Sequence, residues 1–316
     1  MRRPVVAVTG ATGFLGRRLV PALIQAGWDV RALVRAAPAQ GLWGDEGPTL
    51  IAGDLGDTPA LRRLTVDAQV VIHAAGLIKA PRRSDFFDVN ADGVRRVVEA
   101  APPSSRIVLI SSLAAREPQL SDYAASKRAG EATVSELAAG RSSIVRPPAI
   151  YGPGDRETLA LFRLAATSPV LPLLGGPAAR LVLAHVDDVV DAIVHLASLD
   201  AGPAKLVVTG DRPEGYAWRE ILCAAAAAVG RARAALIPVP SGVVTALGAA
   251  SEFLGLATGR PAIFTRGKAR EILHPDWSVP ETERFAAGPP ARFTLAAGFV
   301  QTVRWYRANG WLATPV

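Results

Sequence analysis

The sequence predicts an α/β protein built on a doubly wound parallel sheet, with a smaller, mostly helical lobe at its carboxyl end. Short apolar runs alternate with helix-like segments through the first half of the chain, as in sheets covered by helices on both faces. A glycine-rich turn follows the first apolar run directly. After residue 147 prolines and glycines become dense and the alternation is lost, which indicates a second structural unit.

The expected elements follow from the apolar periodicity of each segment. The helix at 15–26 places Leu19 and Leu23 on its apolar face, and Gly27 ends it. Strands are expected at 5–9, 30–34, 50–52, 70–74, 107–110, 143–145 and 206–208, and further helices at 89–101, 121–139 and 186–196. We therefore expect one domain over residues 1–150, and a lobe over residues 151–316 that returns some strands and helices to it.

Composition limits the partners of the chain. Half of the 316 residues are hydrophobic, so a sizeable core is expected. The net charge of +7 would suit nucleic acid or anionic lipid, but the basic residues are spread along the whole chain and lack interleaved aromatics. We interpret them as a solvated surface and expect no nucleic-acid partner. The single cysteine, Cys223, excludes an intramolecular disulfide, suits a reducing cytoplasmic location, and is expected to be buried.

Two segments could suggest a membrane. The amino-terminal residues 1–3 are basic, but Gly10 interrupts the short apolar run after them, so no secretion signal is expected. Residues 234–251 carry no charge, yet they contain prolines and are too short to span a bilayer. We interpret this segment as buried structure of the second lobe, with loose membrane contact as the alternative, and expect no stable membrane insertion.

Three glycines at intervals of three, Gly10, Gly13 and Gly16, join the first strand to the first helix. Such a turn lets the backbone approach a ligand, and the helix amino terminus offers N–H groups and partial positive charge to a pyrophosphate. Gly16 would also let the helix lie close to the sheet. We therefore expect a Rossmann-type dinucleotide-binding domain over residues 1–150, with an ordinary tight turn as the alternative.

Tyr123 and Lys127 stand four positions apart within residues 121–131. On a helix this spacing puts both side chains on one face, one turn from each other. A phenol with a pKa of about 10 is a poor acid or base at neutral pH, and a nearby ammonium is expected to lower that pKa. The pair therefore indicates proton transfer to an alcohol or ketone oxygen, with a surface helix pair as the alternative.

The apolar run at 107–110 ends in Ser111 and Ser112 at the carboxyl edge of the predicted sheet, where ligands bind in open α/β sheets. Together with residues 9–16 and 121–131, this arrangement resembles the extended branch of the short-chain dehydrogenase/reductase family, which includes the nucleotide-sugar epimerases and dehydratases. The resemblance implies that Ser112 hydrogen-bonds the substrate oxygen, that Tyr123 transfers the proton, and that Lys127 also holds the nicotinamide ribose. Ser111 is the less favoured donor. The cofactor-binding residues that the resemblance implies are Gly10, Thr12, Gly13, Phe14, Leu15, Gly16, Arg35, Asp54, Leu55, Ala74, Ala75, Gly76, Tyr123, Lys127 and Pro147.

The end of the second predicted strand bears on the choice of dinucleotide. Val34 occupies the place where NAD-preferring relatives usually carry an acid, and Arg35 follows it. A guanidinium can bind a 2′-phosphate through two hydrogen bonds. We therefore expect NADP as the cofactor, with NAD as the alternative.

Two segments bear on the substrate class: the connection between Ser112 and Tyr123, and the apolar segment at 242–265. Only ten residues separate Ser112 from Tyr123, whereas epimerases and dehydratases usually insert a longer loop there. The apolar segment at 242–265 resembles the hydroxysteroid dehydrogenase and flavanol reductase side of the family instead. We expect hydride transfer to or from an apolar ketone or alcohol, with a nucleotide-sugar epimerase or dehydratase, or a non-catalytic sensor or accessory subunit, as alternatives. The four histidines show no ligand spacing, so no metal is expected, and a homodimer is the oligomeric state common in the family.

Overall fold

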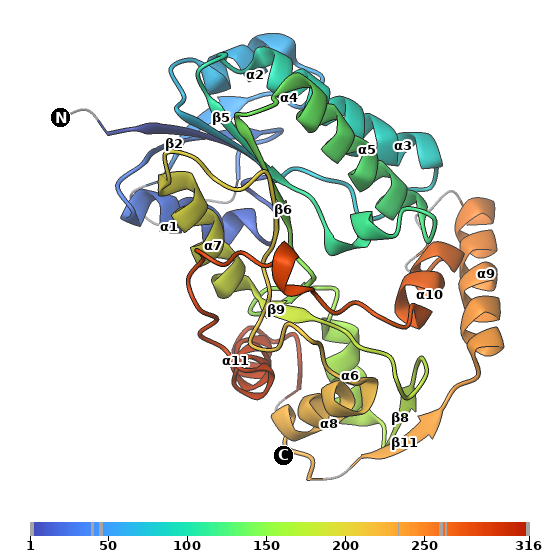
Figure 1. Cartoon of the computed structure of the whole chain (residues 1–316). Coiled ribbons are helices and arrows are strands. Elements are labelled where there is room, and N and C mark those ends of the chain that lie inside the picture. The colour runs from blue at the N-terminus through green and yellow to red at the C-terminus, as the bar shows by residue number, and fades with distance from the viewer. Residues whose placement is uncertain are drawn as a thin grey trace.

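The first strand lies inside a seven-stranded sheet, with two strands on one side of it and four on the other (Figure 1). This computed structural model describes residues 3–38, 41–43, 47–232, 234–258, 262 and 264–313. All pairings in the sheet are parallel, in the order β10-β6-β5-β4-β1-β2-β3. Its strands are β1 (Val5–Thr9), β2 (Asp29–Val34), β3 (Thr49–Ala52), β4 (Val70–His73), β5 (Arg106–Ile110), β6 (Ser142–Arg146) and β10 (Lys205–Val207). The predicted doubly wound sheet is confirmed.

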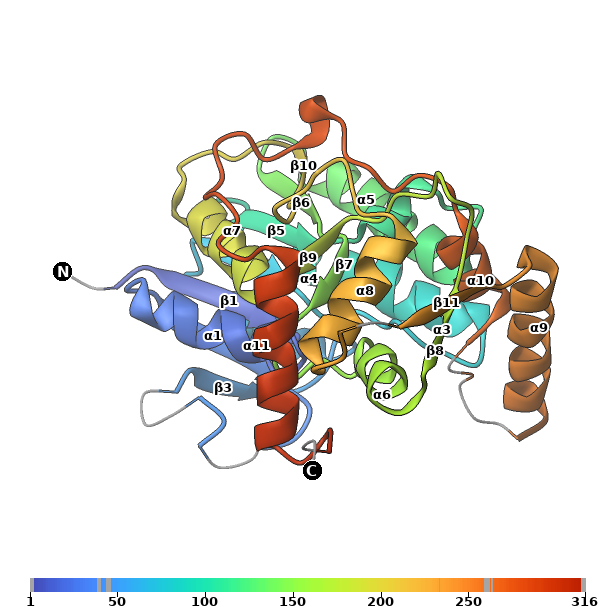
Figure 2. The same cartoon turned by 90° about the horizontal axis from the view of Figure 1, so that it is seen from below.

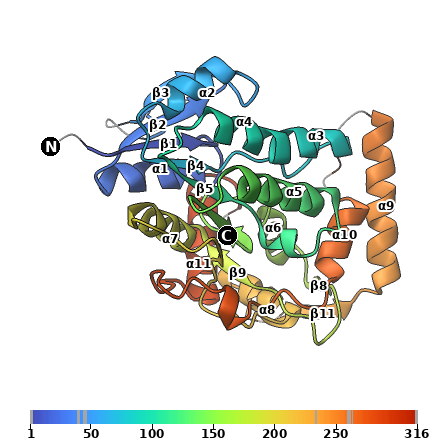
Figure 3. The ribbon, with the colours of Figure 1, turned by 45° about the horizontal axis from the view of Figure 1, so that its top comes forward.

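Helices cover both faces of this sheet (Figure 3). On one face α1 (Gly16–Gln25) packs beside α7 (Val186–Ser198), and Leu23 and Ile193 belong to one buried cluster. On the other face lie α2 (Thr58–Thr65), α4 (Gly93–Ala100) and α5 (Asp122–Leu137), where Leu61 and Val97 are buried. A short helix α3 (Arg83–Phe87) and a π-helical turn η1 (Asp88–Asp92) precede α4, and a 3-10 turn η2 (Leu113–Arg116) follows β5. The apolar runs of the strands are therefore buried on both faces, as parallel sheets require.

The remaining elements form a lobe beyond the carboxyl edge of β6 (Figure 2). It contains the parallel strand pairs β7 (Ala149–Tyr151) with β9 (Leu183–His185), and β8 (Val170–Leu173) with β11 (Ala235–Pro238). Around a core that includes Phe162 and Phe299 lie α6 (Leu159–Thr167), α8 (Trp218–Ala228) and α11 (Leu295–Ala308). The chain also forms α9 (Ser241–Thr258), α10 (Arg266–Leu273) and the 3-10 turn η3 (Glu281–Glu283). Both α7 and β10 return to the large sheet, and a domain boundary at residue 150 stays a prediction.

Two expectations about burial are wrong. Cys223 is exposed, because α8 buries Ile221, Leu222 and Ala225 on the side that faces the lobe and turns position 223 outward. The uncharged segment at 234–251 is not buried structure either. It forms β11 and most of α9, and α9 packs against α10 on one side only, leaving large apolar side chains on the other. None of the described helices combines the length and the hydropathy needed to cross a bilayer.

Candidate active site

The glycine turn leaves no room for side chains at two of its three glycines. Gly10 has φ +75°, and a Cβ placed on it would lie 2.5 Å from the backbone nitrogen of Ala75. A Cβ on Gly16 would lie 2.2 Å from the carbonyl oxygen of Gly10. The third glycine, Gly13, donates its N–H to that same oxygen at 3.0 Å. The first strand, the turn and α1 are thus packed at backbone distance, as a pyrophosphate-binding turn requires.

The amino end of α1 suits an anion. Its first turn carries no acidic side chain, and Leu15 at the N-cap supplies no side-chain hydrogen bond to the helix. The N–H groups of Arg17 and Arg18 already bond the carbonyl oxygens of Gly13 and Leu15, so this end offers an anion the positive end of the helix dipole with no acidic side chain to oppose it. Thr12 is exposed at this turn, and Phe14 and Leu15 are half-buried. The residues present fit the diphosphate of a dinucleotide.

The other predicted cofactor residues lie along the same carboxyl edge of the sheet. Ala75 donates its N–H to the Thr9 hydroxyl at 3.2 Å, which holds the segment 74–76 beside the glycine turn. The pairing of Val34 with Ala52 brings the ends of β2 and β3 together. Two further predicted residues follow these strand ends, Arg35 exposed after β2 and Asp54 exposed after β3. Leu55 packs on Gly93 at the start of α4, and its contribution to a cofactor site stays a prediction.

The three predicted catalytic residues meet where β5 ends and α5 begins. The Ser121 hydroxyl accepts the N–H of Ala124 at 2.9 Å and so starts α5. Tyr123 stands in the first turn, half-buried, with its ring edge-to-face against Phe86 at 6.5 Å between centroids. Ser112 follows β5, its hydroxyl accepts the N–H of Ala114 at 3.2 Å, and it lies close enough to the Tyr123 phenol to lower that phenol's pKa. The backbone near Ser112 is fixed from the other side, because Leu113 donates its N–H to the carbonyl of Pro147 at 2.9 Å.

Lys127 is buried one turn further along α5. Its side chain is 6% exposed, and Nζ donates a hydrogen bond of 2.7 Å to the carbonyl oxygen of Ile110. Nζ also lies 3.5 Å from the point that a Cβ on Gly76 would occupy. An ammonium has three donors. After the bond to Ile110, two remain for groups bound beside the segment 74–76.

Burial shifts the pKa values of both groups, and in opposite directions. It raises the pKa of the Tyr123 phenol to about 12, with Ser112 opposing the rise and the Glu271 carboxylate adding to it. Burial lowers the pKa of Lys127 to about 8, against the attraction of Glu131. The expectation that Lys127 lowers the pKa of Tyr123 is therefore wrong for this structure. The charge that acts on the phenol here is the negative one of Glu271, while the Lys127 ammonium is bonded to Ile110.

Residues that sequence reasoning missed hold this site in place. Glu131, on α5, is 2% exposed and accepts hydrogen bonds from Ser111 and Arg146. Its position four residues after Lys127 was a signal, because it puts both charges on one helix face. Glu271 on α10 accepts a hydrogen bond from Ser121, and its place in the sequence carries no such signal. Asn90 is buried and bridges the backbone of Leu77 to the Ser126 hydroxyl.

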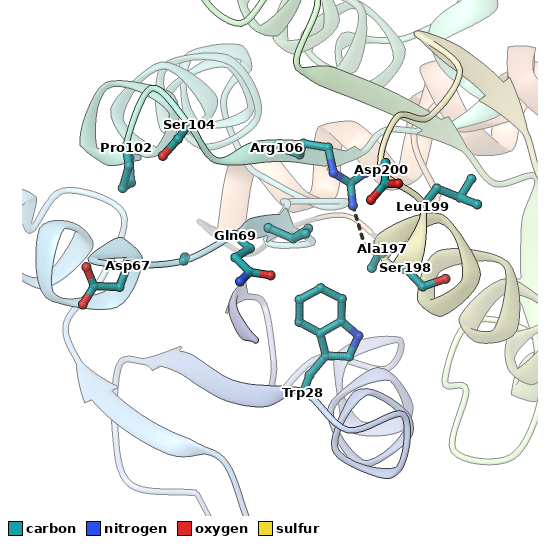
Figure 4. A pocket seen from close by; sticks show the side chains of 12 residues that line it. Trp28, Asp67, Gln69, Pro102, Ser104, Arg106, Ala197, Ser198, Leu199 and Asp200 are labelled. Atoms are coloured by element: carbon teal, nitrogen blue, oxygen red, sulfur yellow. Dashed lines mark hydrogen bonds between the residues drawn. The ribbon is translucent and has the colours of Figure 1, made fainter. Parts of the chain in front are cut away.

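A cavity of about 450 Å³ lies elsewhere, near the amino ends of β4 and β5 (Figure 4). Trp28, Gln69 and Arg106 line it, and Arg106 donates to the carbonyl oxygen of Ala197 at 2.6 Å. No predicted site residue lines this cavity. Among the described residues no group of three histidine, cysteine or acidic side chains gathers as a metal site would require.

The glycine turn and the Ser112, Tyr123 and Lys127 cluster together define a dinucleotide-dependent oxidoreductase with a Rossmann-type fold. The chain belongs to the NAD dependent epimerase/dehydratase family, whose model matches residues 6–209. The predicted family is thereby confirmed, and with it an NAD-dependent type of redox enzyme.

Individual relatives agree with this family. A ceramide reductase of Caulobacter vibrioides (strain NA1000 / CB15N) is 50% identical over 313 residues, which are 98% of this chain and 96% of that protein. The mitochondrial NADH dehydrogenase (ubiquinone) 1 alpha subcomplex subunit 9 of Dictyostelium discoideum is 26% identical over 231 residues, 69% of this chain and 62% of that protein. The crystal structure of gox2253 is similar in fold, with a TM-score of 0.75 and 21% identity over 98% of this chain and 100% of that one.

Proposed function

We propose that this protein reduces a ketone on a ceramide-like lipid, with NADPH as the hydride donor. The observation that carries the proposal is the half-buried Tyr123 phenol, held beside Ser112 at the carboxyl edge of a dinucleotide-type sheet. A relative that is 50% identical over almost the whole chain is a ceramide reductase, which supports this substrate class.

The surroundings of Ser112 suit an apolar substrate. Its neighbour Leu113 belongs to a buried apolar cluster with Trp277 and Val279, contributed by the segment after α10. Four of the ten residues between Ser112 and Tyr123 form η2 and the last of them begins α5, so the connection from β5 to α5 is short. The longer loop that sugar-nucleotide enzymes usually insert here is absent from this connection, which favours the ketone reductase over the epimerase.

In the proposed reaction Ser112 and Tyr123 donate hydrogen bonds to the ketone oxygen. When bound, the reduced nicotinamide supplies the hydride that adds to the carbonyl carbon. Tyr123 then gives its proton to the oxygen, which becomes the hydroxyl of the product. A pKa of about 12 keeps the phenol protonated at neutral pH, as an acid in this direction requires. Lys127 is charged below pH 8 or so, and it would hold the nicotinamide ribose through the donors that its bond to Ile110 leaves.

The preference for NADPH rests on Arg35. It is exposed at the carboxyl end of β2, next to the buried Val34. A 2′-phosphate there would meet a guanidinium and no carboxylate at position 34. Changing Arg35→Gln should raise the KM for NADPH by about tenfold or more and leave that for NADH nearly unchanged. An equal effect on both cofactors would exclude this role.

The direct test follows NADPH absorbance with a purified sample and a short-chain ceramide that carries a ketone in its sphingoid part. We expect NADPH oxidation and one alcohol product, and no turnover of UDP-sugars. Tight binding of UDP-sugars without ketone reduction would favour the epimerase. Cofactor binding with no turnover of any ketone would favour a non-catalytic accessory subunit.

A further inference from the structure

One face of α9 is apolar along its whole length and lies against solvent. Val243, Leu247, Phe253 and Leu254 are exposed by 47%, 59%, 70% and 61%. Of the ten large apolar side chains that are exposed in the described residues, these four share a single helix. Ala246, Ala250 and Ala257 are exposed between them, at the three- and four-residue intervals of one helix face. We call this surface, residues 243, 246, 247, 250, 253, 254 and 257, the α9 stripe.

The α9 stripe is not covered by the described part of the chain. The opposite side of α9 packs on α10, where Val244 is buried and a Cβ on Gly248 would lie 3.2 Å from that of Ala269. Figures 1 and 3 show α9 at the periphery of the molecule, outside α10. The stripe spans about 20 Å along the helix, from 1.5 Å per residue. Contiguous exposed apolar surface of this kind marks an interaction site.

We propose that the α9 stripe docks the protein on the surface of an anionic lipid bilayer, with α9 lying in the plane of the interface. Among the described residues no helix combines the length and apolarity needed to cross a bilayer, whereas a one-sided apolar helix suits the boundary between headgroups and acyl chains. Glu252 is the one acidic residue of α9, and its carboxylate accepts the backbone N–H of Arg266. The stripe itself therefore carries no charge that would have to enter the lipid.

The charges beside the stripe favour a bilayer over a second copy of the chain. On α10, Arg266, Lys268 and Arg270 are exposed, while Glu271 is buried. Lys268 already pairs with the Glu271 carboxylate at 3.3 Å, so anionic headgroups would compensate Arg266 and Arg270. In a symmetric dimer formed through α9, the cations of one α10 would face the same cations of the other subunit, and like charges repel.

The position of α9 gives the docking a purpose, and this step rests on the proposed lipid substrate. Helix α10, on which α9 packs, touches the start of α5. A Cβ on Gly267 of α10 would lie 2.7 Å from that of Ser121, and Glu271 of α10 accepts a hydrogen bond from Ser121. Tyr123 follows two residues later. A bilayer against α9 would therefore lie next to the elements that hold the proton donor, where a lipid substrate must arrive.

The test is flotation of the full chain with vesicles of phosphatidylcholine alone or with phosphatidylglycerol. We expect binding to the anionic vesicles, and at least about tenfold weaker binding when Leu247, Phe253 and Leu254 are all changed to Ser. The matched control changes Val66 and Val300 to Ser. These two side chains lie outside α9 and are exposed by 50% and 44%, and the control should bind vesicles as the natural chain does. Phe253→Trp adds a second readout, a blue shift of its emission on anionic vesicles.

Three outcomes would overturn the docking: no flotation of the natural chain with either vesicle, equal flotation of the triple variant, or a natural dimer that becomes monomeric in that variant without vesicle binding. The proposed reduction is separated from docking by a short-chain substrate in free solution. The triple variant should turn over that substrate at the natural rate, because none of its changes touches Ser112, Tyr123 or Lys127. Vesicle binding without any ketone reduction would leave the docking standing and reject the function.

Discussion

Glu131 and Arg146 form a buried ion pair joined by two hydrogen bonds, from Nε to Oε1 at 2.7 Å and from Nη2 to Oε2 at 2.6 Å. Glu131 belongs to α5, which carries Tyr123, and Arg146 ends β6. The Ser111 hydroxyl donates to the same Oε1 at 2.7 Å. One carboxylate thus ties the proton-donor helix to the two strand ends beneath it.

Removing the Glu131 carboxylate should lower the stability of the folded protein. Glu131→Ala leaves the Arg146 guanidinium, whose side chain is 4% exposed, buried without its partner. We expect a loss of about 3–5 kcal/mol in the free energy of unfolding. Glu136→Ala, an exposed position on the same helix, is the control and should change it by about 0.5 kcal/mol or less. The measurement is urea unfolding followed by circular dichroism, and equal losses for both variants would contradict a structural role of the pair.

Changing Tyr123→Phe should remove catalysis and keep the cofactor site. The phenylalanine ring preserves the contact with Phe86, while the proton that the phenol would transfer is lost. We expect kcat to fall by about 100- to 10,000-fold with an almost unchanged Kd for NADPH. Tyr216→Phe is the matched control, because that hydroxyl bonds Asp211 within the second lobe. A Tyr123 variant with natural turnover would mean that another group transfers the proton.

Glu271 should control the pH at which the reverse reaction runs. Oxidation of the alcohol needs the Tyr123 phenolate, and the Glu271 carboxylate raises the pKa of that phenol by disfavouring its negative form. Glu271→Gln keeps a hydrogen-bond acceptor for Ser121 but removes the charge. The alkaline rise of kcat for alcohol oxidation should therefore shift to lower pH, while reduction at pH 7, which uses the protonated phenol, stays within about twofold.

Glu252→Gln is the control for this experiment, since its carboxylate bonds the N–H of Arg266 on the far side of α10. Its pH profile should match that of the natural chain. If Glu271→Gln and Glu252→Gln give the same profile, the charge at position 271 does not act on the phenol.

The sheet and the cluster of Ser112, Tyr123 and Lys127 could be predicted from the sequence because both depend on local patterns. Strands buried on both faces appear as continuous apolar runs, as in residues 5–8, and parallel pairing puts their carboxyl ends on one edge. Tyr123 and Lys127 needed only helical spacing to be placed together. The predicted helix at 121–139 agrees with α5 because Ser121 supplies its cap.

Two features could not be predicted from the sequence, because they depend on packing between segments that are distant along the chain. Glu271 stands 150 positions after Ser121, and only the docking of α10 on the start of α5 brings them together. The apolar face of α9 has the same periodicity as one that meets a protein core. Whether Leu247 is buried or exposed is decided by what lies opposite it, which the pattern of one helix does not contain.

The glycine turn offers a test that separates backbone conformation from close packing. Gly10 and Gly27 both have positive φ, at +75° and +90°, but a Cβ on Gly27 meets nothing within 4 Å. Gly27→Ala should therefore cost about 1–2 kcal/mol of unfolding free energy, the strain of a left-handed alanine alone. Gly10→Ala adds a clash 2.5 Å from the nitrogen of Ala75, so it should cost more and should also weaken NADPH binding, because the turn must open to relieve that contact. Thermal unfolding and NADPH fluorescence titration measure the two effects. If Gly10→Ala lost no more stability than Gly27→Ala and bound NADPH as the natural chain does, the close approach of the turn to the segment 74–76 would have no part in cofactor binding.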